Sequence, residues 1–316
     1  MACRVCLARG AGAFKREMVE KYSSFVDVEL LLKWLSKPLP QSFRVNTLKV
    51  RDPEEVIARL SDRGVRVEKL PWFEFGYRVV EGAVTKSIEH SLGYIYVQDG
   101  GSMMPPLALE VEEDSTVIDL CAAPGSKATQ IAQLMDNTGG LVANDVSRER
   151  VKLLVYNVQR MGAYNTVVTM MDGRAIPRKT TTRFDFVLVD VPCSSIGEVR
   201  RTWGPALKWS QKAVKGFSRL QKQLLAAGFE LLKPGGVLVY STCTFDPEEN
   251  EEVVDHLLRA RDDAELEAVS IRGAKCSPGL VKWPGGEYLS ELKRTARVYP
   301  FHNDTGGYYI ARVRRR

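Results

Sequence analysis

Long hydrophobic runs are missing from this sequence of 316 residues. No apolar stretch approaches the roughly 20 residues that a membrane-spanning helix needs. Charged residues such as Arg4, Arg9 and Lys15 interrupt the first positions, where a signal peptide carries an apolar core. The 6 cysteines are too few and too unevenly spaced for a disulfide scaffold. These absences predict a soluble, cytoplasmic protein that does not associate with a membrane.

Neither sign of charge dominates the sequence. Lys and Arg together number 45 and Asp and Glu 39, so the formal net charge is +6. Hydrophobic residues make up 44% and charged residues 27%, which excludes disordered and collagen-like chains. No internal repeat or low-complexity tract is present. The length accommodates about two domains, and the positive balance permits a polyanionic partner without requiring one.

The N-terminal third mixes short helical and strand-like segments. Apolar spacing and Pro38 predict a helix over 25–36, and Asp52-Pro53 opens a second helix that runs to about residue 62. Alternation predicts strands at 43–46, 65–68 and 77–80. We therefore expect a small α+β domain over residues 1–99.

From residue 100 onward, strands and helices alternate. Strands are predicted at 116–120, 140–145, 165–170, 184–190, 236–241 and 308–312. Helices are predicted at 126–135, 147–161, 210–232 and 247–261. This alternation is typical of right-handed βαβ units and predicts an α/β domain over 100–316, with a doubly wound parallel sheet buried on both faces.

Acidic residues stand at or just after the carboxyl ends of four predicted strands, at Asp119, Asp145, Asp172 and Asp190. Ligands of open α/β sheets bind at that edge. A single aspartate there would mean little, because turns after strands often contain Asp. Four on one edge predict a binding site, in which Asp145 would hold a ribose and Asp172 an adenine amino group.

The first of these strands leads into the segment Cys121-Ala122-Ala123-Pro124-Gly125-Ser126-Lys127, followed by a helix. Small residues let a ligand approach the backbone, and the free N–H groups of the helix suit a carboxylate. The segment is neither the glycine-rich fingerprint of dinucleotide binding nor a phosphate-binding loop of nucleoside triphosphatases. We therefore expect an adenosyl compound as the ligand.

Two cysteines, Cys193 and Cys243, each follow a predicted central strand. A lone cysteine is usually a small buried hydrophobic residue. At the ligand edge, however, a helix N-terminus or Lys127 would lower the thiol pKa and favour the thiolate. A thiolate that adds to carbon 6 of cytosine activates carbon 5 for methylation. Asp190 could stabilise the charge on the ring, and a second cysteine could assist release of the product.

The segment 198–223 contains seven Lys or Arg and one Glu, with aromatic residues at Trp203, Trp209 and Phe217. Basic and aromatic side chains beside a catalytic loop suit a phosphate backbone and an extruded base. The alternative is a solvated helix whose aromatic residues lie in the core. The position directly after Cys193 favours RNA contact. The arginines after residue 311 add to this charge or belong to a frayed end.

Several motifs together resemble the RNA cytosine-5 methyltransferases of the Sun/Fmu type. They are DLCAAPGSK at 119–127, DVPCS at 190–194, STCTFDPEENE at 241–251, FRVNTLK at 43–49, VQDGGSM at 97–103 and RVYPFH at 297–302. The resemblance covers about residues 22–313. It implies a class I, Rossmann-like methyltransferase domain that uses S-adenosylmethionine, preceded by an RNA-binding domain.

The resemblance also implies roles for individual residues. S-adenosylmethionine would be bound by Cys121 to Lys127 and by Asp145, Arg150, Asp172 and Asp190. Asp190 would also contact the target base, Cys243 would be the nucleophile, and Cys193 would assist release. Lys127 would join them in catalysis. The chain departs from the usual pattern at Val191, at Ser195 where glycine is frequent, and at Gly307-Tyr308-Tyr309 where G-F-F is usual.

Cys3 and Cys6 form a single C-x-x-C pair. Zinc would need two further ligands, for which only His90, His256, His302 and Cys276 remain, none at a suitable spacing. We expect no metal.

These observations predict a methyltransferase that acts on carbon 5 of cytosine in RNA, with tRNA favoured over rRNA, and with no obligatory protein partner. Two rivals stay open. A DNA cytosine-5 methyltransferase also uses a P-C cysteine, but the second cysteine and the N-terminal domain argue against it. A non-catalytic RNA-binding assembly factor on the same scaffold would not need both cysteines and all four acids.

Overall fold

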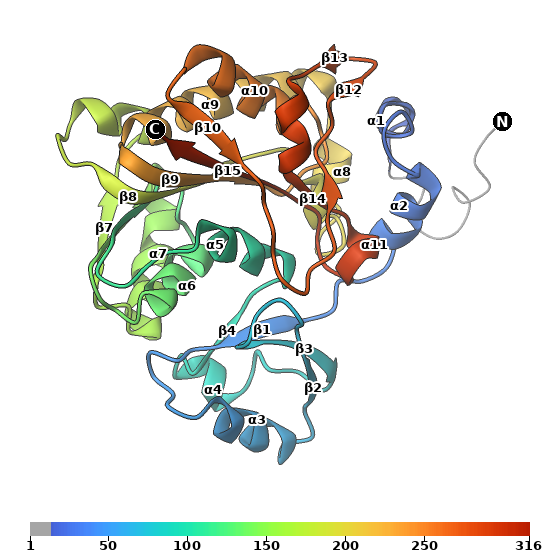
Figure 1. The fold of residues 1–316 in the computed structure, drawn as a ribbon. Helices are drawn as coiled ribbons and strands as arrows, with labels where there is room; N and C mark the ends of the chain where they lie inside the picture. The colour runs from blue at the N-terminus through green and yellow to red at the C-terminus, as the bar shows by residue number, and fades with distance from the viewer. Residues whose placement is uncertain (1–13) are drawn as a thin grey trace.

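The computed structural model describes residues 14–316, which form a large β-sheet, a small β-sheet and a two-stranded ribbon (Figure 1). The large sheet lies in the upper part of Figure 1 and the small sheet in the lower part. Cys3 and Cys6 lie outside the described residues.

Five neighbouring strands of the large sheet run parallel, in the order β7-β6-β5-β8-β9. They are β5 (Thr116–Asp119), β6 (Gly140–Asp145), β7 (Thr166–Met170), β8 (Phe184–Asp190) and β9 (Leu232–Thr242). The chain starts at β5, moves outward to β7, and returns to add β8 on the other side. The adjacent strands β5 and β8 therefore mark the topological switch point, as in a Rossmann-like sheet.

Helices cover both faces of this sheet. Met104, Ile131 and Leu154 belong to the hydrophobic cluster on one face, beneath α5 (Met104–Leu109), α6 (Ser126–Leu134) and α7 (Arg148–Met161). Leu225 and Val254 belong to the cluster on the other face, beneath η4 (Gly173–Arg178), α9 (Gln211–Glu230) and α10 (Glu251–Ala260). Because both faces are covered, the central strands are apolar throughout, as their sequences indicated.

Local signals fix the helix boundaries. The Ser147 side chain accepts a hydrogen bond from the Arg150 backbone N–H at the start of α7, and Gly162 ends that helix with a left-handed φ of 70°. Ser210 caps α9 in the same way, by accepting from the Ala213 N–H. These caps place both helices within two residues of the predicted bounds.

The large sheet is not parallel throughout, and here the prediction was wrong. Strand β15 (Tyr308–Arg315) pairs antiparallel with β9, in a register that sets Tyr309 opposite Thr242. Strands β10 (Ala264–Glu267) and β14 (Ala296–Val298) pair antiparallel with β15, and β11 (Ser277–Pro278) pairs antiparallel with β14. Only a short segment with α11 (Pro300–Asn303) joins β14 to β15, too short for a parallel crossover, so these two strands run antiparallel.

The small sheet is antiparallel, in the order β2-β3-β1-β4. Its strands are β1 (Ser42–Val45), β2 (Arg66–Lys69), β3 (Gly76–Glu81) and β4 (Ile95–Val97). Helices α3 (Pro53–Ser61) and α4 (Ile88–Ser91) complete this unit. Its own core includes Phe43, Val56, Leu60 and Ile95.

Helices α1 (Arg16–Tyr22) and α2 (Val28–Leu35) do not pack on the small sheet. Their buried residues Met18, Tyr22 and Leu31 share a hydrophobic cluster with Ile196 and Phe245. In Figure 1, α2 lies beside α11 (Pro300–Asn303) and α1 lies above α2, both away from β1–β4. The first two helices therefore contribute to the core of the larger domain.

The remaining elements are short. They are η3 (Gly101–Met103), η5 (Ile196–Glu198), α8 (Gly204–Lys208), β12 (Lys282–Trp283), β13 (Gly286–Glu287) and η6 (Ser290–Arg294). Among residues 14–316, no helix is both long and apolar enough to cross a lipid bilayer. The described residues also contain no group of three His, Cys, Asp or Glu side chains arranged to hold a metal ion.

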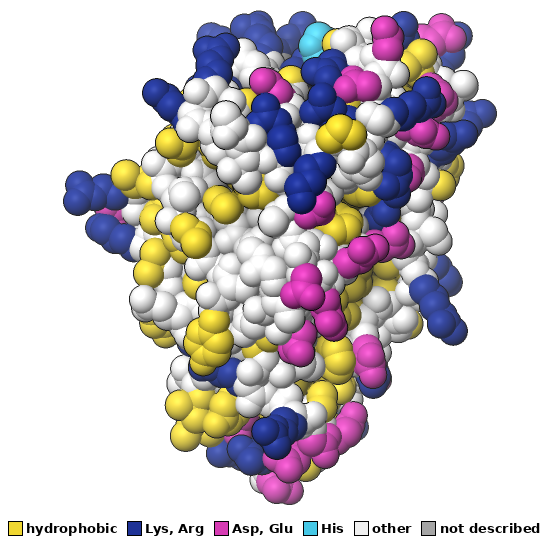
Figure 2. Space-filling view, turned by 60° about the vertical axis from the view of Figure 1, so that its left-hand side comes forward, with side chains coloured by type: hydrophobic (Ala, Val, Ile, Leu, Met, Phe, Trp, Pro, Cys, Tyr) yellow, Lys and Arg dark blue, Asp and Glu magenta, His cyan; other side chains and the backbone are white. Residues whose placement is uncertain are grey.

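The surface drawn in Figure 2 is obtained by turning the left side of Figure 1 forward. Lys and Arg side chains are densest over its upper part, and hydrophobic side chains are scattered in small groups. Exposed hydrophobic residues at this end of the large sheet include Tyr156 and Tyr164 near the edge strand β7, as well as Val167 within it. Small separate groups of this kind are common on monomeric surfaces.

Candidate active site

The carboxyl ends of the parallel strands bring the four predicted aspartates to one edge of the large sheet. Asp119 ends β5, Asp145 ends β6 and Asp190 ends β8, while Asp172 follows β7 by two residues. Only Asp119 and Asp190 line the same cavity, because β5 and β8 are neighbours at the switch point. Asp145 and Asp172 lie progressively farther along the edge.

This cavity, which we name the cofactor pocket, has a volume of about 230 Å³. Its floor is the segment between β5 and α6, including Cys121, Ala122, Ala123, Pro124, Ser126 and Lys127. Gly125 precedes α6 with a φ of 107°, a left-handed conformation that favours glycine. The pocket therefore combines a small-residue floor with the N-terminus of a buried helix.

Asp119 carries a buried oxygen that needs a partner. Its Oδ1 accepts a hydrogen bond from the Cys121 backbone N–H, but Oδ2 has no hydrogen-bond partner among residues 14–316. Burial, and then the negative charge of Asp190, raise the pKa of Asp119 to about 8, although Lys127 acts in the opposite direction. A cationic ligand group in the pocket would satisfy this oxygen and favour its ionised form.

Lys127 and Asp190 form a partly buried ion pair at the pocket. The Lys127 Nζ lies 2.7 Å from Asp190 Oδ2, and the Ser241 hydroxyl donates to Asp190 Oδ1 at 2.6 Å. Burial lowers the pKa of Lys127, but the charge and hydrogen bond of Asp190 outweigh it, so the pKa is raised overall. The lysine is therefore positively charged and fixes the carboxylate between β8 and β9.

The two predicted catalytic cysteines meet beside this ion pair. Cys243 follows the end of β9 and Cys193 follows the end of β8, and their Sγ atoms are 3.1 Å apart. The Cys243 backbone N–H also points to Cys193 Sγ at 3.4 Å. Cys243 lines the cofactor pocket, so residues that are 50 positions apart lie together at the centre of the site.

The expected lowering of the thiol pKa is wrong for Cys243. The contact with the Cys193 thiol, burial, and the nearby negative charge of Glu198 raise the pKa of Cys243 well above its ordinary value. Lys127 is too strongly engaged with Asp190 to reverse these effects. Without a ligand the Cys243 side chain is therefore a thiol at neutral pH.

Close backbone approach explains one glycine of the site. The Gly197 N–H donates to the Cys243 carbonyl at 2.8 Å, and the Gly197 carbonyl accepts from the Gly307 N–H at 3.0 Å. A Cβ atom at Gly197 would collide with the carbonyls of Gly307 and Cys243. This residue therefore ties the loops after β8 and β9 to the start of β15.

A buried carboxylate that the sequence analysis missed joins the two cysteine loops. Asp246 Oδ2 accepts hydrogen bonds from Tyr22 at 2.8 Å and from the Trp209 indole at 3.0 Å. It also accepts from Ser194 and Thr244, which follow the two cysteines and contact one another at 2.6 Å. Asp246 lies in the STCTFDPEENE segment, but only the tertiary structure shows what it holds.

The sequence analysis also missed three residues that line another wall of the cofactor pocket. Asp99, Glu198 and Tyr308 line it, and the Tyr308 hydroxyl donates to Glu198 Oε1 at 2.7 Å. Burial, and then the charge of Glu198, raise the pKa of Asp99 to about 6. Tyr308 occupies one of the positions where the chain departs from the usual pattern, so this hydrogen bond depends on that departure. In the sequence, the tyrosine in place of the usual phenylalanine was the signal that could have identified Tyr308 as a site residue.

Asp145 contacts the floor of the pocket from outside. Its Oδ2 accepts a hydrogen bond from the Ala123 N–H at 3.3 Å and lies 3.2 Å from Arg150 Nη1. Arg150 also donates to the Ala123 carbonyl. The carboxylate is buried and does not line the pocket, so its direct contact in this structure is with the loop backbone.

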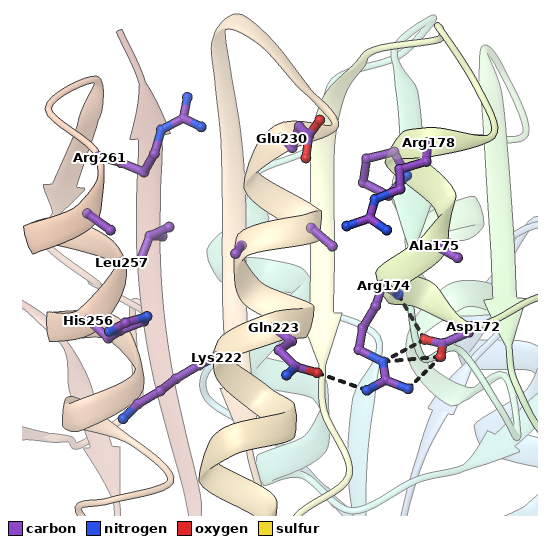
Figure 3. A pocket seen from close by; sticks show the side chains of 14 residues that line it. Asp172, Arg174, Ala175, Arg178, Lys222, Gln223, Glu230, His256, Leu257 and Arg261 are labelled. Carbon is purple, nitrogen blue, oxygen red and sulfur yellow. Dashed lines mark hydrogen bonds and ion pairs between the residues drawn. The ribbon is translucent and has the colours of Figure 1, made fainter.

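Asp172 faces a different cavity, a surface groove of about 670 Å³ between η4, α9 and α10 (Figure 3). Its carboxylate pairs with the Arg174 guanidinium at 2.6 Å, and Arg174 also donates to Gln223 at 2.8 Å. The groove is larger than the cofactor pocket, but its lining contains no cysteine. The structure thus does not bring Asp172 into contact with the cofactor pocket.

The basic segment 198–223 divides into core and surface residues. Trp209 is 1% exposed and belongs to the core, contrary to the expected RNA contact. Trp203 packs against Phe14 but is only half-buried, so part of its ring stays accessible. Arg200 is also buried, where it donates to carbonyls such as that of Thr305. The basic side chains of the segment that are exposed are those of Arg201, Lys208, Lys212, Lys215 and Arg219.

The fold and the site together define a class of enzyme. The site fits S-adenosylmethionine. The unpartnered oxygen of Asp119 would accept the ammonium group of the cofactor, and the N-terminus of α6 would bind its carboxylate. The protein is therefore an S-adenosylmethionine-dependent methyltransferase.

Family models identify its family. The model described as 16S rRNA methyltransferase RsmB/F matches residues 106–314, and that of the N-terminal domain of 16S rRNA methyltransferase RsmF matches residues 12–100. The chain belongs to the RsmB/F family of RNA (cytosine-5) methyltransferases. This membership separates it from the DNA cytosine-5 methyltransferases.

Two curated relatives differ in how much of their length the chain covers. The tRNA (cytosine(49)-C(5))-methyltransferase of Pyrococcus abyssi is 43% identical over 95% of this chain and 96% of its own length. The ribosomal RNA small subunit methyltransferase F of Vibrio atlanticus is 37% identical over 92% of this chain but only 61% of its own length.

Two solved structures share the whole architecture. A methyltransferase homologue from Pyrococcus horikoshii has a TM-score of 0.82 at 34% identity and covers 92% of this chain, which covers 90% of it. The NSun6 of the same organism, solved with SFG, has a TM-score of 0.83 at 26% identity, with 96% of this chain and 98% of that chain covered. SFG is an analogue of S-adenosylmethionine.

Proposed function

We propose that this enzyme methylates carbon 5 of cytosine in tRNA through a covalent adduct between Cys243 and carbon 6 of the base. The observation that carries the proposal is the pair of thiols at 3.1 Å beside the Lys127–Asp190 ion pair at the switch point. Carbon 5 of cytosine is a weak nucleophile until a thiolate adds to carbon 6. The cofactor pocket holds a nucleophile and a charged pair, and a second thiol lies 3.1 Å from the first, which meets that requirement.

The chain's own residues divide the work. Cys243 Sγ loses its proton to water and bonds to carbon 6, and the electron pair of the ring double bond moves so that carbon 5 becomes nucleophilic. S-adenosylmethionine supplies the methyl group on a positively charged sulfonium, and a positive charge beside Cys243 favours the thiolate. Asp190, held by Lys127 and Ser241, faces the base and stabilises the charge that develops on the ring.

Release requires a second proton transfer. After methylation, a base removes the hydrogen from carbon 5, the bond between Cys243 Sγ and carbon 6 breaks, and the aromatic ring is restored. Cys193 Sγ lies 3.1 Å from Cys243 Sγ and can accept that proton as a thiolate. The distance fits either order, so we assign Cys193 to product release and Cys243 to nucleophilic attack from the resemblance to the Sun/Fmu type.

We place the cofactor on residues Cys121 to Lys127, with its ammonium group on Asp119. Asp145 and Arg150 would support the ribose side by holding the Ala123 backbone. A direct contact between Asp172 and adenine would require Arg174 to release the carboxylate. The cofactor role of Asp172 is therefore the weakest of these assignments on geometric grounds.

The choice of tRNA is supported by the extent of the match. The tRNA enzyme of P. abyssi is matched over nearly its whole length, whereas the rRNA enzyme of V. atlanticus is matched over 61% of it. Residues 100–316 would carry catalysis, and residues 1–99 would add RNA contacts. A reducing, cytoplasmic location is consistent with two thiols that lie close enough to oxidise.

The test is a denaturing gel of protein incubated with S-adenosylmethionine and labelled total tRNA, rRNA or DNA. We expect wild-type protein to methylate tRNA without a persistent adduct. Cys193→Ala should accumulate a slowly migrating RNA–protein band, because attack proceeds and release fails. Cys243→Ala should give neither methylation nor the band.

Other patterns would change the proposal in defined ways. A band with Cys243→Ala alone would exchange the roles of the two cysteines. Methylation of rRNA in place of tRNA would correct the substrate. RNA binding without any binding of S-adenosylmethionine would favour the non-catalytic assembly factor, which retention of both thiols and of Lys127 argues against.

A further inference from the structure

A second cavity lies on the other side of the cysteine pair. It has a volume of about 460 Å³ and is formed by the loop after β8, by α8 and by the start of α9. Cys193 lines it, whereas Cys243 lines the cofactor pocket, and no residue lines both cavities. With the two Sγ atoms 3.1 Å apart, only the cysteine pair and its loops separate the two cavities. We name this cavity the Cys193 pocket.

The lining of the Cys193 pocket combines a flat apolar surface with hydroxyl groups. Phe217 is half-buried, and it belongs to none of the hydrophobic clusters of the described chain. Pro205 and Trp209 add further apolar surface, and Ser195 and Thr202 contribute hydroxyls. Such a surface suits a planar heterocycle that stacks on an aromatic ring.

The charge of the Cys193 pocket is positive. Lys208 is exposed at its rim and forms no ion pair with any residue from 14 to 316. No Asp or Glu lines the cavity. Lys212, on the next helix, is also exposed and unpaired within the described part of the chain. An aromatic surface with cations at its edge is complementary to a base and its phosphate.

We infer that the Cys193 pocket binds the nucleotide next to the target cytidine in the RNA strand. The inference rests on the proposed function, because it takes RNA as the substrate. When the target base lies against Cys243, its neighbour in the strand must be within one nucleotide of the cysteine pair. The base of that neighbour stacks on Phe217, and its phosphate contacts Lys208.

This occupant explains why a half-buried aromatic ring remains outside the core beside a catalytic thiol. The subsite makes methylation depend on the nucleotide beside the cytosine, through stacking on Phe217 more than through hydrogen bonds. Stacking between a base and an aromatic side chain changes binding about tenfold when the ring is removed. The pocket is therefore a determinant of sequence context, separate from the atoms that react.

The test uses the full chain and short RNA substrates that contain its target cytosine. In two further substrates, the nucleotide 5′ or 3′ of the cytosine is replaced by an abasic residue. We expect wild-type kcat/KM to fall about tenfold for one of the two abasic substrates. Phe217→Leu should lose about the same factor on the intact RNA and nothing more on that abasic RNA.

The matched control is Leu207→Ala. Leu207 precedes Lys208, is 61% exposed and does not line the pocket, so this variant should discriminate between the substrates as wild type does. A direct readout places 2-aminopurine at the sensitive flank. Its fluorescence should be quenched when wild-type protein binds the RNA and less quenched with Phe217→Leu, whose unfolding midpoint reports whether it is folded.

Two results would overturn the inference. Equal activity of wild type on intact and both abasic substrates would mean that no neighbouring nucleotide is bound. Additive losses from Phe217→Leu and the abasic residue would mean that the ring acts only through the structure. Failure of wild type to methylate any RNA would instead contradict the proposed function, and the subsite with it, before any variant is compared.

Discussion

At the scale of single residues, chemistry here depends on groups whose properties burial has changed. Asp119 has a pKa raised to about 8, and the pKa of Cys243 is raised well above its ordinary value. Both side chains are therefore held in their neutral forms at neutral pH in the free enzyme. A cationic cofactor in the same cavity would favour the ionised forms of both. Under the proposed mechanism, binding of the cofactor would in this way favour the thiolate of Cys243.

Asp119 gives a pH-dependence whose sign is defined. With a pKa of about 8, the free carboxyl is protonated below that pH, and it must lose its proton to pair with an ammonium group. We expect affinity for S-adenosylmethionine to rise with pH between about 6 and 8, by at most about tenfold per unit. Calorimetry in buffers of different ionisation enthalpy should detect release of a proton on binding.

The control for this prediction is Asp119→Asn, which resembles the protonated form. This variant should bind more weakly and show no rise of affinity between pH 6 and 8. If the affinity of wild type for S-adenosylmethionine did not change over the same range, Asp119 would not be the residue that binds the ammonium group. The raised pKa also means that Asp119 stabilises the fold at low pH and that this contribution is lost as pH rises through about 8.

At the scale of elements, α9 presents different sides to the core and to solvent. Val214, Ser218 and Leu225 are buried, whereas Lys212, Lys215 and Arg219 are exposed. Positions three and four apart share one side of a helix, so the cations form a row. The row begins beside Lys208 at the Cys193 pocket. In the proposed complex, these cations would contact phosphates of the RNA strand next to the target nucleotide.

The triple variant Lys208→Ala, Lys212→Ala and Lys215→Ala tests this row. Each lysine that contacts a phosphate contributes about 0.7 to 0.9 to the slope of log affinity against log salt concentration. We expect RNA binding to weaken and the slope to become shallower by about two, as measured by titrations at several salt concentrations. S-adenosylmethionine affinity should stay unchanged.

A matched triple variant elsewhere on the surface separates local contact from net charge. Lys33, Lys282 and Lys293 are exposed and belong to α2, β12 and η6, not to α8 or α9. Their replacement by alanine removes the same charge and should leave the salt dependence within error of wild type. Equal slopes for wild type and the α8–α9 variant would show that these lysines form a solvated helix surface that does not contact RNA.

At the scale of the whole molecule, the N-terminal helices are part of the catalytic domain. Lys21 on α1 lies 2.6 Å from Asp246 Oδ1 and 2.7 Å from Glu248, and Tyr22 contacts the same aspartate. Asp246 in turn binds the loops that carry the two cysteines. The order of the catalytic loops therefore depends on a segment more than 200 residues away in the chain.

Asp246→Asn measures that dependence. The substitution removes the buried charge that accepts hydrogen bonds from Tyr22 and Trp209 but leaves Glu248 as a carboxylate partner of Lys21, so it costs about 2 kcal/mol of the free energy of unfolding. We expect this loss in urea denaturation followed by circular dichroism, together with reduced methyl transfer, because the Ser194 and Thr244 contacts weaken. Asp262→Asn, at an exposed position, should change neither quantity. A loss below about 1 kcal/mol would show that the network contributes little.

Much of the architecture was predictable because its signals are local. Apolar runs gave the five parallel strands, and Ser147, Gly162 and Ser210 bounded helices at the expected places. The antiparallel direction of β15 was not predictable, since a strand's sequence does not state which neighbour it pairs with. The packing of α1 and α2 on the larger domain was missed for the same reason: an amphipathic helix does not specify the surface that it covers.

The sequence by itself determined which reactive groups exist and which strand ends carry them, because periodicity and motif spacing are properties of neighbouring residues. Only the tertiary structure decided which of these groups meet. It placed Asp119 and Asp190 in one cavity and directed Asp172 into another, and it brought the thiols of Cys193 and Cys243 within 3.1 Å. The physical reason is that strand order, burial and the pKa shifts that follow from burial arise from contacts between distant segments.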